Sequence, residues 1–409
     1  MELQRTTTNG LFGSSADDLL RFNSSNELSH HSNTNIFRIK EISPELRKEK
    51  YSYKNEKNVL KRFALRLKTD SQYLRSTAQI VFLLLCIWIG IEFYLFMKWG
   101  LSDGQLPFYE RPPGVEGFLP ISALISLKYW LQTGVINNIH PSGLFIFIAI
   151  LIMGILLKKS FCGWLCPVGT ISESLWMLGR KIFGINFNLN RWFDYPLRSL
   201  KYLLLFFFAY SIWQMDIESL VVFINSPYNK VADIKMFLFF ANISSFALWT
   251  IIIMMMFSLF VKNFWCRYLC PYGALLGALS WLSPTKITRN KTSCINCELC
   301  TKACPSSIKV HKVNTVWSDE CMNCLACVQA CPVKNTLDIR TPITKTIVPN
   351  WVFGILIIGI FIAITGLAML TNNWQNKISK DEYLKRFIEL DTPLYQHNRG
   401  QVPEYGPND

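Results

Sequence analysis

The chain has 409 residues, half of them hydrophobic, and a formal net charge of +14. Its Lys and Arg residues gather in the N-terminal arm and beside apolar runs, which argues against a nucleic-acid-binding surface and favours a membrane protein. Thirteen cysteines occur without the short apolar core of a signal peptide in the first 77 residues. We therefore expect metal or redox roles for most of the thiols rather than a secreted disulfide framework.

Residues 1–77 form a polar, basic arm that we expect to be partly disordered, because it is rich in Ser, Asn and Thr. The segment 42–68 is strongly basic and is expected to be partly helical. Two interpretations of the arm remain open: it lies on anionic lipid, or it is simply solvated.

About five apolar runs follow that are long enough, or nearly so, to cross a membrane. They are 78–100, 143–157 with an extension to Phe161, 198–214, 245–262 and 350–371. The semi-polar stretch 118–134 is expected to be re-entrant or interfacial. The amphipathic stretch 171–184 is expected to lie along the membrane surface.

The distribution of basic residues predicts the orientation. Lys and Arg number 14 in the arm, whereas the segments 101–141 and 217–244 carry two each. Lys158 and Lys159 precede one cysteine pair, and Lys262 precedes another. The excess of basic residues on the cytoplasmic side then places the arm and all the clustered cysteines in the cytoplasm of a bacterial inner-membrane protein. Five spans would leave the tail, 372–409, outside.

A repeated cysteine motif occurs at the ends of two apolar runs. LLKKSFCGWLCPVGT (156–170) aligns with LFVKNFWCRYLCPYGA (259–274), so that Cys162 matches Cys266 and Cys166 matches Cys270. The spacing places both thiols of a pair on one face of a helix, which the following proline ends or kinks. Both copies have the same orientation, which predicts two like-oriented membrane halves.

Three interpretations of these four thiols remain open. They could bind a metal or cluster together, act as two redox-active dithiols, or pack as small buried residues. The repeat argues against packing alone, because cysteines are unlikely to recur at matched positions by coincidence.

The segment between the fourth and fifth apolar runs carries two further cysteine runs, CINCELCTKACP (294–305) and CMNCLACVQACP (321–332). Both follow the C-x2-C-x2-C-x3-C-P spacing of bacterial two-cluster ferredoxins, in which the fourth cysteine of each run binds the other cluster. A zinc site would show separated pairs of cysteines instead. We therefore predict two [4Fe–4S] clusters; the first is bound by Cys294, Cys297, Cys300 and Cys331, and the second by Cys321, Cys324, Cys327 and Cys304.

Several lone residues are weaker candidates. Glu92, Lys128 and His140 are considered for a quinol pocket, although structural roles are favoured for each. Cys86 lies in the middle of an apolar run and is interpreted as a packing residue.

The cysteine motifs together resemble the NapH/NosR-type polyferredoxin membrane proteins. The stretches 111–134 and 224–237 look most like the YccM-like branch of that family, and the resemblance covers about 75–340. It implies an inner-membrane iron–sulfur protein that exchanges electrons between a quinone pool or cytoplasmic donor and a redox partner such as a cytochrome or ferredoxin. The chain lacks a CxxCH haem motif and the large region that precedes the spans in NosR.

The sequence thus predicts a membrane all-α bundle of about five transmembrane helices with an inserted small α+β ferredoxin domain. The expected domains are the arm 1–77, the membrane domain 78–284, the ferredoxin domain 285–345, the last span 346–371 and the tail 372–409. The predicted function is electron transfer, with membership of a quinol dehydrogenase as an open question. The alternative is a membrane redox sensor or an accessory maturation factor.

Overall fold

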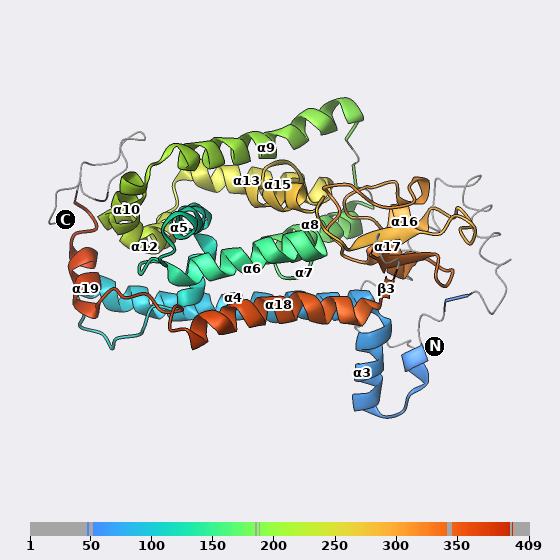
Figure 1. Ribbon diagram of the computed structural model, residues 1–409, viewed down its shortest axis with the longest axis horizontal. Helices are drawn as coiled ribbons and strands as arrows, with labels where there is room; N and C mark the ends of the chain where they lie inside the picture. Colours follow the sequence, from blue (N-terminus) through green and yellow to red (C-terminus); the bar gives the residue numbers. More distant parts are fainter. Residues whose placement is uncertain are drawn as a thin grey trace, which may run out of the picture.

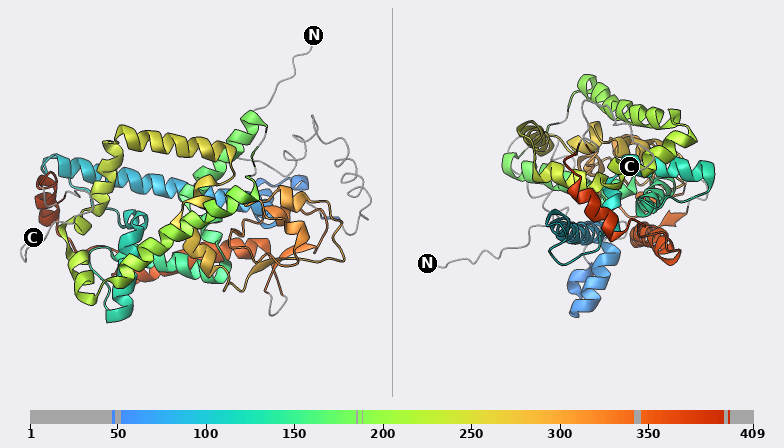
Figure 2. Two further views of the ribbon diagram at one scale, coloured as in Figure 1. Left: turned by 90° about the horizontal axis from the view of Figure 1, so that it is seen from above. Right: turned by 90° about the vertical axis from the view of Figure 1, so that its left-hand side faces the viewer.

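The computed structural model describes residues 47–48, 52–184, 186–187, 189–341, 346–392 and 395. Most of the predicted arm and the end of the predicted tail therefore lie outside the described residues. Long helices lie lengthwise in the molecule, with a small sheet and several short helices at one end and α19 (Lys380–Ile388) at the other (Figure 1). Two further views show the same arrangement from above and along the long axis (Figure 2).

The longest helix, α4 (Ser71–Leu101), follows α3 (Val59–Thr69) after the single residue Asp70. Asp70 caps α4 by accepting hydrogen bonds from the backbone N–H groups of Gln72 and Tyr73. The expectation of helix in the basic segment 42–68 is met over α3, whose N-cap is Asn58.

Two predicted spans are confirmed as helices long and apolar enough to cross a membrane, α4 and α18 (Asn350–Leu370). Two further candidates are bent pairs: α9 (Arg191–Gln214) with α10 (Ile217–Asn225) at 107°, and α12 (Ala232–Ala241) with α13 (Ser245–Phe260) at 83°. By length and composition the described residues thus contain two to four candidate spans.

A shorter apolar helix, α6 (Pro141–Leu157), lies at the second predicted span and packs along α18. The predicted total of about five spans depends on whether α6 crosses the membrane, so that number stays a prediction. The other described helices of the bundle are short or amphipathic: η2 (Ser52–Asn55), η3 (Pro113–Phe118), α5 (Pro120–Thr133), α7 (Ser160–Trp164), α8 (Pro167–Phe183), α11 (Pro227–Lys230), α14 (Phe264–Tyr268) and α15 (Pro271–Leu279).

The cysteine-dense segment folds as a small α+β unit. Strand β1 (Lys286–Arg289) pairs antiparallel with β2 (Leu337–Arg340), so that Ile287 lies opposite Ile339. Strand β2 pairs in turn with β3 (Ile347–Val348). The short helices between β1 and β2 are α16 (Leu299–Lys302), η4 (Val310–Lys312) and α17 (Ala326–Ala330).

One apolar core joins this unit to the bundle. It runs from Ile150 and Met153 in α6 through Trp164 in α7 to Leu325 and Ile339 in the α+β unit, all of which are almost completely buried. Removing this apolar surface from water stabilises the contact by about 25 cal/mol per Å². The α+β unit is therefore packed onto the bundle end and is not a tethered module.

Candidate functional site

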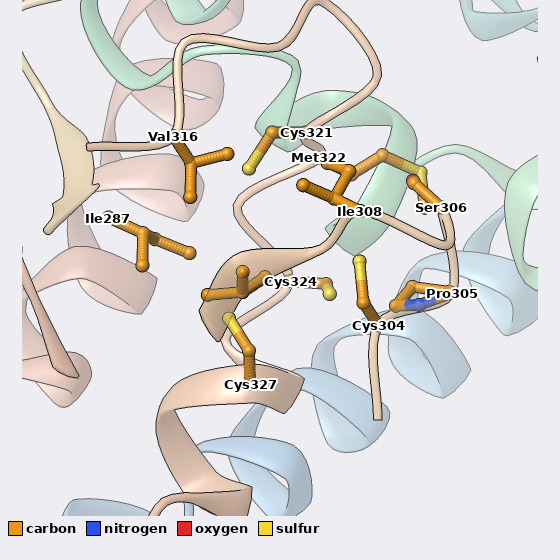
Figure 3. Close-up of a pocket in the computed structure, with 11 residues that line it drawn as sticks. Ile287, Cys304, Pro305, Ser306, Ile308, Val316, Cys321, Met322, Cys324 and Cys327 are labelled. Carbon is orange, nitrogen blue, oxygen red and sulfur yellow. The ribbon is translucent and has the colours of Figure 1, made fainter. Parts of the chain in front are cut away.

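The first of two cysteine-lined cavities lies in the α+β unit next to the bundle. Its lining contains four cysteines, of which Cys321, Cys324 and Cys327 come from the second run and Cys304 from the first. Figure 3 shows their sulfur atoms around a common space, beside the apolar side chains of Ile287 and Val316. The cavity holds about 320 Å³ of space between atoms, and we call it the proximal cavity.

The second cavity, which we call the distal cavity, holds about 370 Å³. Its lining contains Cys294, Cys297 and Cys300 of the first run and Cys331 of the second. Both sets of four cysteines that the spacing predicts to share a cluster therefore line one cavity each, including the two crossing residues Cys304 and Cys331.

The chemistry of both cavities fits an iron–sulfur cluster. Among the thirteen cysteines, all of which lie in the described part, no pair is joined in a disulfide. Burial raises the pKa of Cys304 to about 12 and that of Cys324 to about 11. Such thiols stay protonated unless a metal centre holds them as thiolates, which is what clusters bound by four cysteines do.

The two CxxxCP motifs fold alike. In each, the second cysteine is the N-cap of a helix that starts with proline: Cys166 precedes α8 and Cys270 precedes α15. The Sγ of Cys166 accepts a hydrogen bond from the N–H of Gly169 at 3.4 Å, and the Sγ of Cys270 accepts one from Gly273 at the same distance. Burial raises the pKa of Cys166 to about 11, although the hydrogen bond from Gly169 acts to lower it.

The tight turn explains the glycine in each motif. A Cβ atom added at Gly273 would lie 3.0 Å from the carbonyl oxygen of Cys266, and one added at Gly169 would clash with the carbonyl oxygen of Cys162. Matched prolines, glycines and sulfur contacts in both copies support the predicted repeat.

The four motif cysteines interact electrostatically with one another across the two copies. Burial raises the pKa of Cys162, and negative charge on Cys166 or Cys270 would raise it further. Burial alone would lower the pKa of Lys159, but Glu320, Cys162, Cys266 and Cys270 together raise it. The buried Lys159 is thus near enough to these thiols to interact with them, and its positive charge would stabilise their negative charge.

The first motif touches the loop of the proximal cavity. A Cβ atom added at Gly163 would lie 3.1 Å from the carbonyl oxygen of Met322 and 3.6 Å from the Cβ of Cys324. The indole Nε1 of Trp164 donates to the carbonyl oxygen of Asn323 at 3.1 Å. Gly163 is the one residue between Cys162 and Trp164, so Cys162 lies close in sequence to both contacts.

The second motif contacts the same cavity. Arg267, which occupies the position of Gly163 in the second copy, donates to the carbonyl oxygen of Ser306 at 3.0 Å. Ser306 lines the proximal cavity and follows Cys304 and Pro305. The proximal cavity therefore contacts both CxxxCP motifs.

Lys158 and Lys159, which the sequence analysis used to predict the orientation, are both buried. The Nζ of Lys158 donates to the carbonyl oxygens of Val316 and Ser318 at 2.9 and 3.1 Å. Lys159 pairs with Glu320, which also pairs with Lys201. These lysines attach the bundle to the α+β unit, a role that hydropathy cannot reveal.

The lone candidates have structural partners. Glu92 accepts a hydrogen bond from the indole of Trp88 at 3.0 Å. Lys128 donates to the carbonyl oxygen of Trp213 at 2.9 Å and to that of Met215, so it caps the end of α9. Cys86 is half-buried and lies close enough to Cys166 to interact electrostatically with it.

His140 belongs to a buried polar network that the sequence reasoning missed. Arg111 pairs with Glu116 at 2.8 Å and with Asp233, and the Nδ1 of His140 lies 3.5 Å from Glu116. Nε2 of His140 lies 2.7 Å from the carbonyl oxygen of Asn229. The signal was present, because 111–134 and 224–237 are the stretches that resemble the YccM-like branch. The network fixes η3, α6 and α12 relative to one another.

Among the described residues, no three His, Cys, Asp or Glu side chains are grouped as a single metal ion would require. The role of the four CxxxCP cysteines as metal ligands therefore stays a prediction.

Models of known families match the three cysteine-containing regions. A 4Fe–4S binding domain matches twice, at residues 139–186 and 242–290, each of which contains one CxxxCP motif. A 4Fe–4S dicluster domain matches residues 286–332, which contain both ferredoxin-type runs.

Among curated proteins, "Putative electron transport protein YccM" of Escherichia coli strain K12 is 41% identical over 328 residues, which are 79% of this chain and 91% of that protein. The ferredoxin-type protein NapH of Haemophilus influenzae is 28% identical over 39% of this chain and 52% of its own length. The regulatory protein NosR of Pseudomonas aeruginosa is 27% identical over 35% of this chain and 20% of its own length. No solved structure matches.

Proposed function

The chain belongs to the family of the electron transport protein YccM, and on that premise we propose that it passes electrons between its ferredoxin-type unit and a membrane redox pool. Iron–sulfur clusters, when bound, accept and release single electrons without bond formation. Two such clusters, one in each cysteine-lined cavity, would use all eight cysteines of the two runs as ligands. This leaves no cysteine of the runs for substrate chemistry and favours electron transfer over catalysis.

The observation that carries the proposal is the contact of Gly163 with Met322 and Cys324. It brings the first CxxxCP motif against the loop that lines the proximal cavity. The order along the path would then be the distal cavity, the proximal cavity, the four CxxxCP cysteines and the membrane. We propose that these four thiols hold a further redox centre, and the 4Fe–4S models that match both motifs support this proposal.

The membrane partner that we propose is a quinone. The apolar helices α4 and α18 run from the α+β unit along the bundle, so a lipid-soluble carrier could reach their sides (Figure 1). The α+β unit would face the cytoplasm of a bacterial inner membrane, because the basic residues concentrate at that end of the chain's apolar runs.

The test is anaerobic EPR of the purified full-length chain, reduced first with dithionite and then, in a separate sample, with a menaquinol analogue. The proposal expects two interacting [4Fe–4S] signals with dithionite. It also expects an exchange of electrons between the clusters and the quinol analogue, whose extent depends on the ratio of quinol to quinone. Stoichiometric zinc without iron would overturn the iron–sulfur assignment, and clusters that never exchange electrons with any quinone would overturn the membrane partner alone.

A second candidate function, a redox sensor, is favoured by one observation. The N–H of Lys48 donates to the carbonyl oxygen of Pro332 at 2.9 Å, and Arg47 forms a β-bridge with Val333. The arm thus touches the chain directly after Cys331, so a change at the distal cavity could reach the arm. Deleting residues 1–46 should leave electron transfer intact under the first proposal and abolish a signalling response under the second.

A further inference from the structure

We infer that the outer end of the α+β unit is a docking surface for an acidic, soluble one-electron carrier protein. This inference rests on the proposed function, because it assumes that the distal cavity holds a cluster. The proximal cavity faces the bundle, since α17 contacts α4 and Gly163 packs against Met322. The distal cavity is the one that a soluble partner can approach.

The cysteines of the distal cavity are more exposed than those of the proximal cavity, as docking of a soluble partner requires. All four cysteines of the proximal cavity are buried, whereas Cys294 and Cys300 of the distal cavity are only half-buried. Helix α16, which carries Cys300, contacts α17 and η4 and lies away from the long helices in Figure 1. Electron transfer between a soluble partner and the distal cavity therefore covers a shorter distance than transfer to the proximal cavity.

The surface around the distal cavity is basic. Five lysines are exposed within three residues of its lining: Lys291, Lys302, Lys309, Lys312 and Lys334. Arg47 is also exposed and lies opposite Val333, a residue of the lining. Within residues 286–341, all of which the structure describes, the single exposed acidic residue is Glu298, and its carboxylate lies 3.3 Å from His311. This one-sided charge would steer an acidic protein toward the half-buried cysteines.

The reaction at this surface is a single electron transfer. The reduced carrier loses one electron and the distal centre gains it, or the reverse, and no bond is formed or broken. A reduced flavodoxin, which is acidic and soluble, is a suitable probe of this chemistry. Its binding and its electron exchange are measured separately.

The test compares the wild type with the charge-reversal variant Lys302→Glu/Lys312→Glu, both full-length in nanodiscs. The dissociation constant for flavodoxin is measured by thermophoresis at low ionic strength, and the rate of cluster reduction by stopped flow. We expect weaker binding and slower reduction by about tenfold or more, with the difference shrinking at high salt. The matched control is Lys385→Glu, an exposed lysine on α19 at the opposite end, which should change neither quantity.

Three results separate the possible failures. Equal binding of flavodoxin to the wild type and the double variant, or an equal loss in Lys385→Glu, would overturn the docking surface. Loss of flavodoxin binding when the wild-type nanodisc contains anionic rather than zwitterionic lipid would also overturn it, because the lysines would then serve the membrane. Reduction by dithionite reports the clusters themselves, so its failure in the wild type would instead overturn the proposed function.

Discussion

Gly163 packs against Met322 so closely that a Cβ atom on the glycine would lie 3.1 Å from the Met322 carbonyl oxygen and 3.2 Å from its Cβ. Gly163 lies directly after Cys162, and Met322 lies directly after Cys321. The contact therefore joins the first CxxxCP motif to the ferredoxin-type loop, with backbone on one side and no room for a larger side chain.

Replacing Gly163 with Val should push this loop away from the bundle. Inserting methyl groups into a packed contact costs about 1–3 kcal/mol, so we expect a lower thermal unfolding temperature and loss of iron from the proximal cavity. The matched control is Gly359→Val in α18, where nothing lies within 4 Å of the added Cβ atom. Wild-type iron content together with an unchanged unfolding temperature in Gly163→Val would show that the contact is unimportant.

The crossing of Cys304 and Cys331 between the runs predicts which variants share a phenotype. Cys331→Ser should remove the same EPR signal as Cys294→Ser, because both line the distal cavity. Cys304→Ser should instead remove the signal that Cys321→Ser removes. Two substitutions in the same cavity should remove no more EPR signal than either one alone. Cys331→Ser combined with Cys327→Ser should instead remove both signals. Loss of one signal by Cys331→Ser and Cys327→Ser alike would contradict the crossing.

The grouping of the eight ferredoxin-type cysteines around two cavities was predictable from the sequence, and the reason is local. The spacing of Cys294, Cys297 and Cys300 fixes a tight loop, and the crossing of the fourth cysteine follows from the known geometry of the motif. The helices α4 and α18 were equally predictable, because an unbroken apolar run of this length is itself the signal.

The contact between the helical bundle and the α+β unit was not predictable from the sequence. Lys158 and Lys159 look like a solvated flank, but their partners Val316 and Glu320 lie more than 150 residues away in the chain. The pair of Arg111 with Asp233 likewise joins residues that are 122 positions apart in the chain. The bends after Gln214 and Ala241 were also missed, because hydropathy reports the length of an apolar run and not its direction.

A buried ion pair between Arg75 and Glu173 fixes α4 against α8, and its removal makes a second stability prediction. The two side chains are nearly inaccessible, and their closest atoms lie 2.5 Å apart. Arg75→Leu or Glu173→Leu alone leaves a buried charge and should cost about 3–5 kcal/mol. The double variant should recover most of that loss. The exposed Lys61→Leu is the control, with a change within about 0.5 kcal/mol. Additive losses in the double variant, measured by denaturation in detergent, would show that the pair is not coupled.

Glu320 links two buried lysines of the bundle, Lys159 and Lys201, to the α+β unit. Glu320→Gln would leave both cations without their carboxylate, and such loss of a buried partner is strongly destabilising. We therefore expect limited proteolysis to cleave the α+β unit of this variant faster than that of the wild type. Glu298→Gln, at an exposed carboxylate of the same unit, should leave the rate of cleavage unchanged. Equal rates in Glu320→Gln and the wild type would show that the lysines do not depend on Glu320.

The central claim is that the CxxxCP cysteines hold a redox centre next to the proximal cavity. The most direct measurement is the iron and sulfide content, with anaerobic EPR, of the wild type beside a variant in which Cys162, Cys166, Cys266 and Cys270 are all Ser. Cys86→Ser, outside both motifs, is the control and should retain its iron. The account predicts less iron and sulfide in the quadruple variant, with the two ferredoxin-type signals still present. Unchanged iron and sulfide would contradict it and leave the four thiols as dithiols or packing residues.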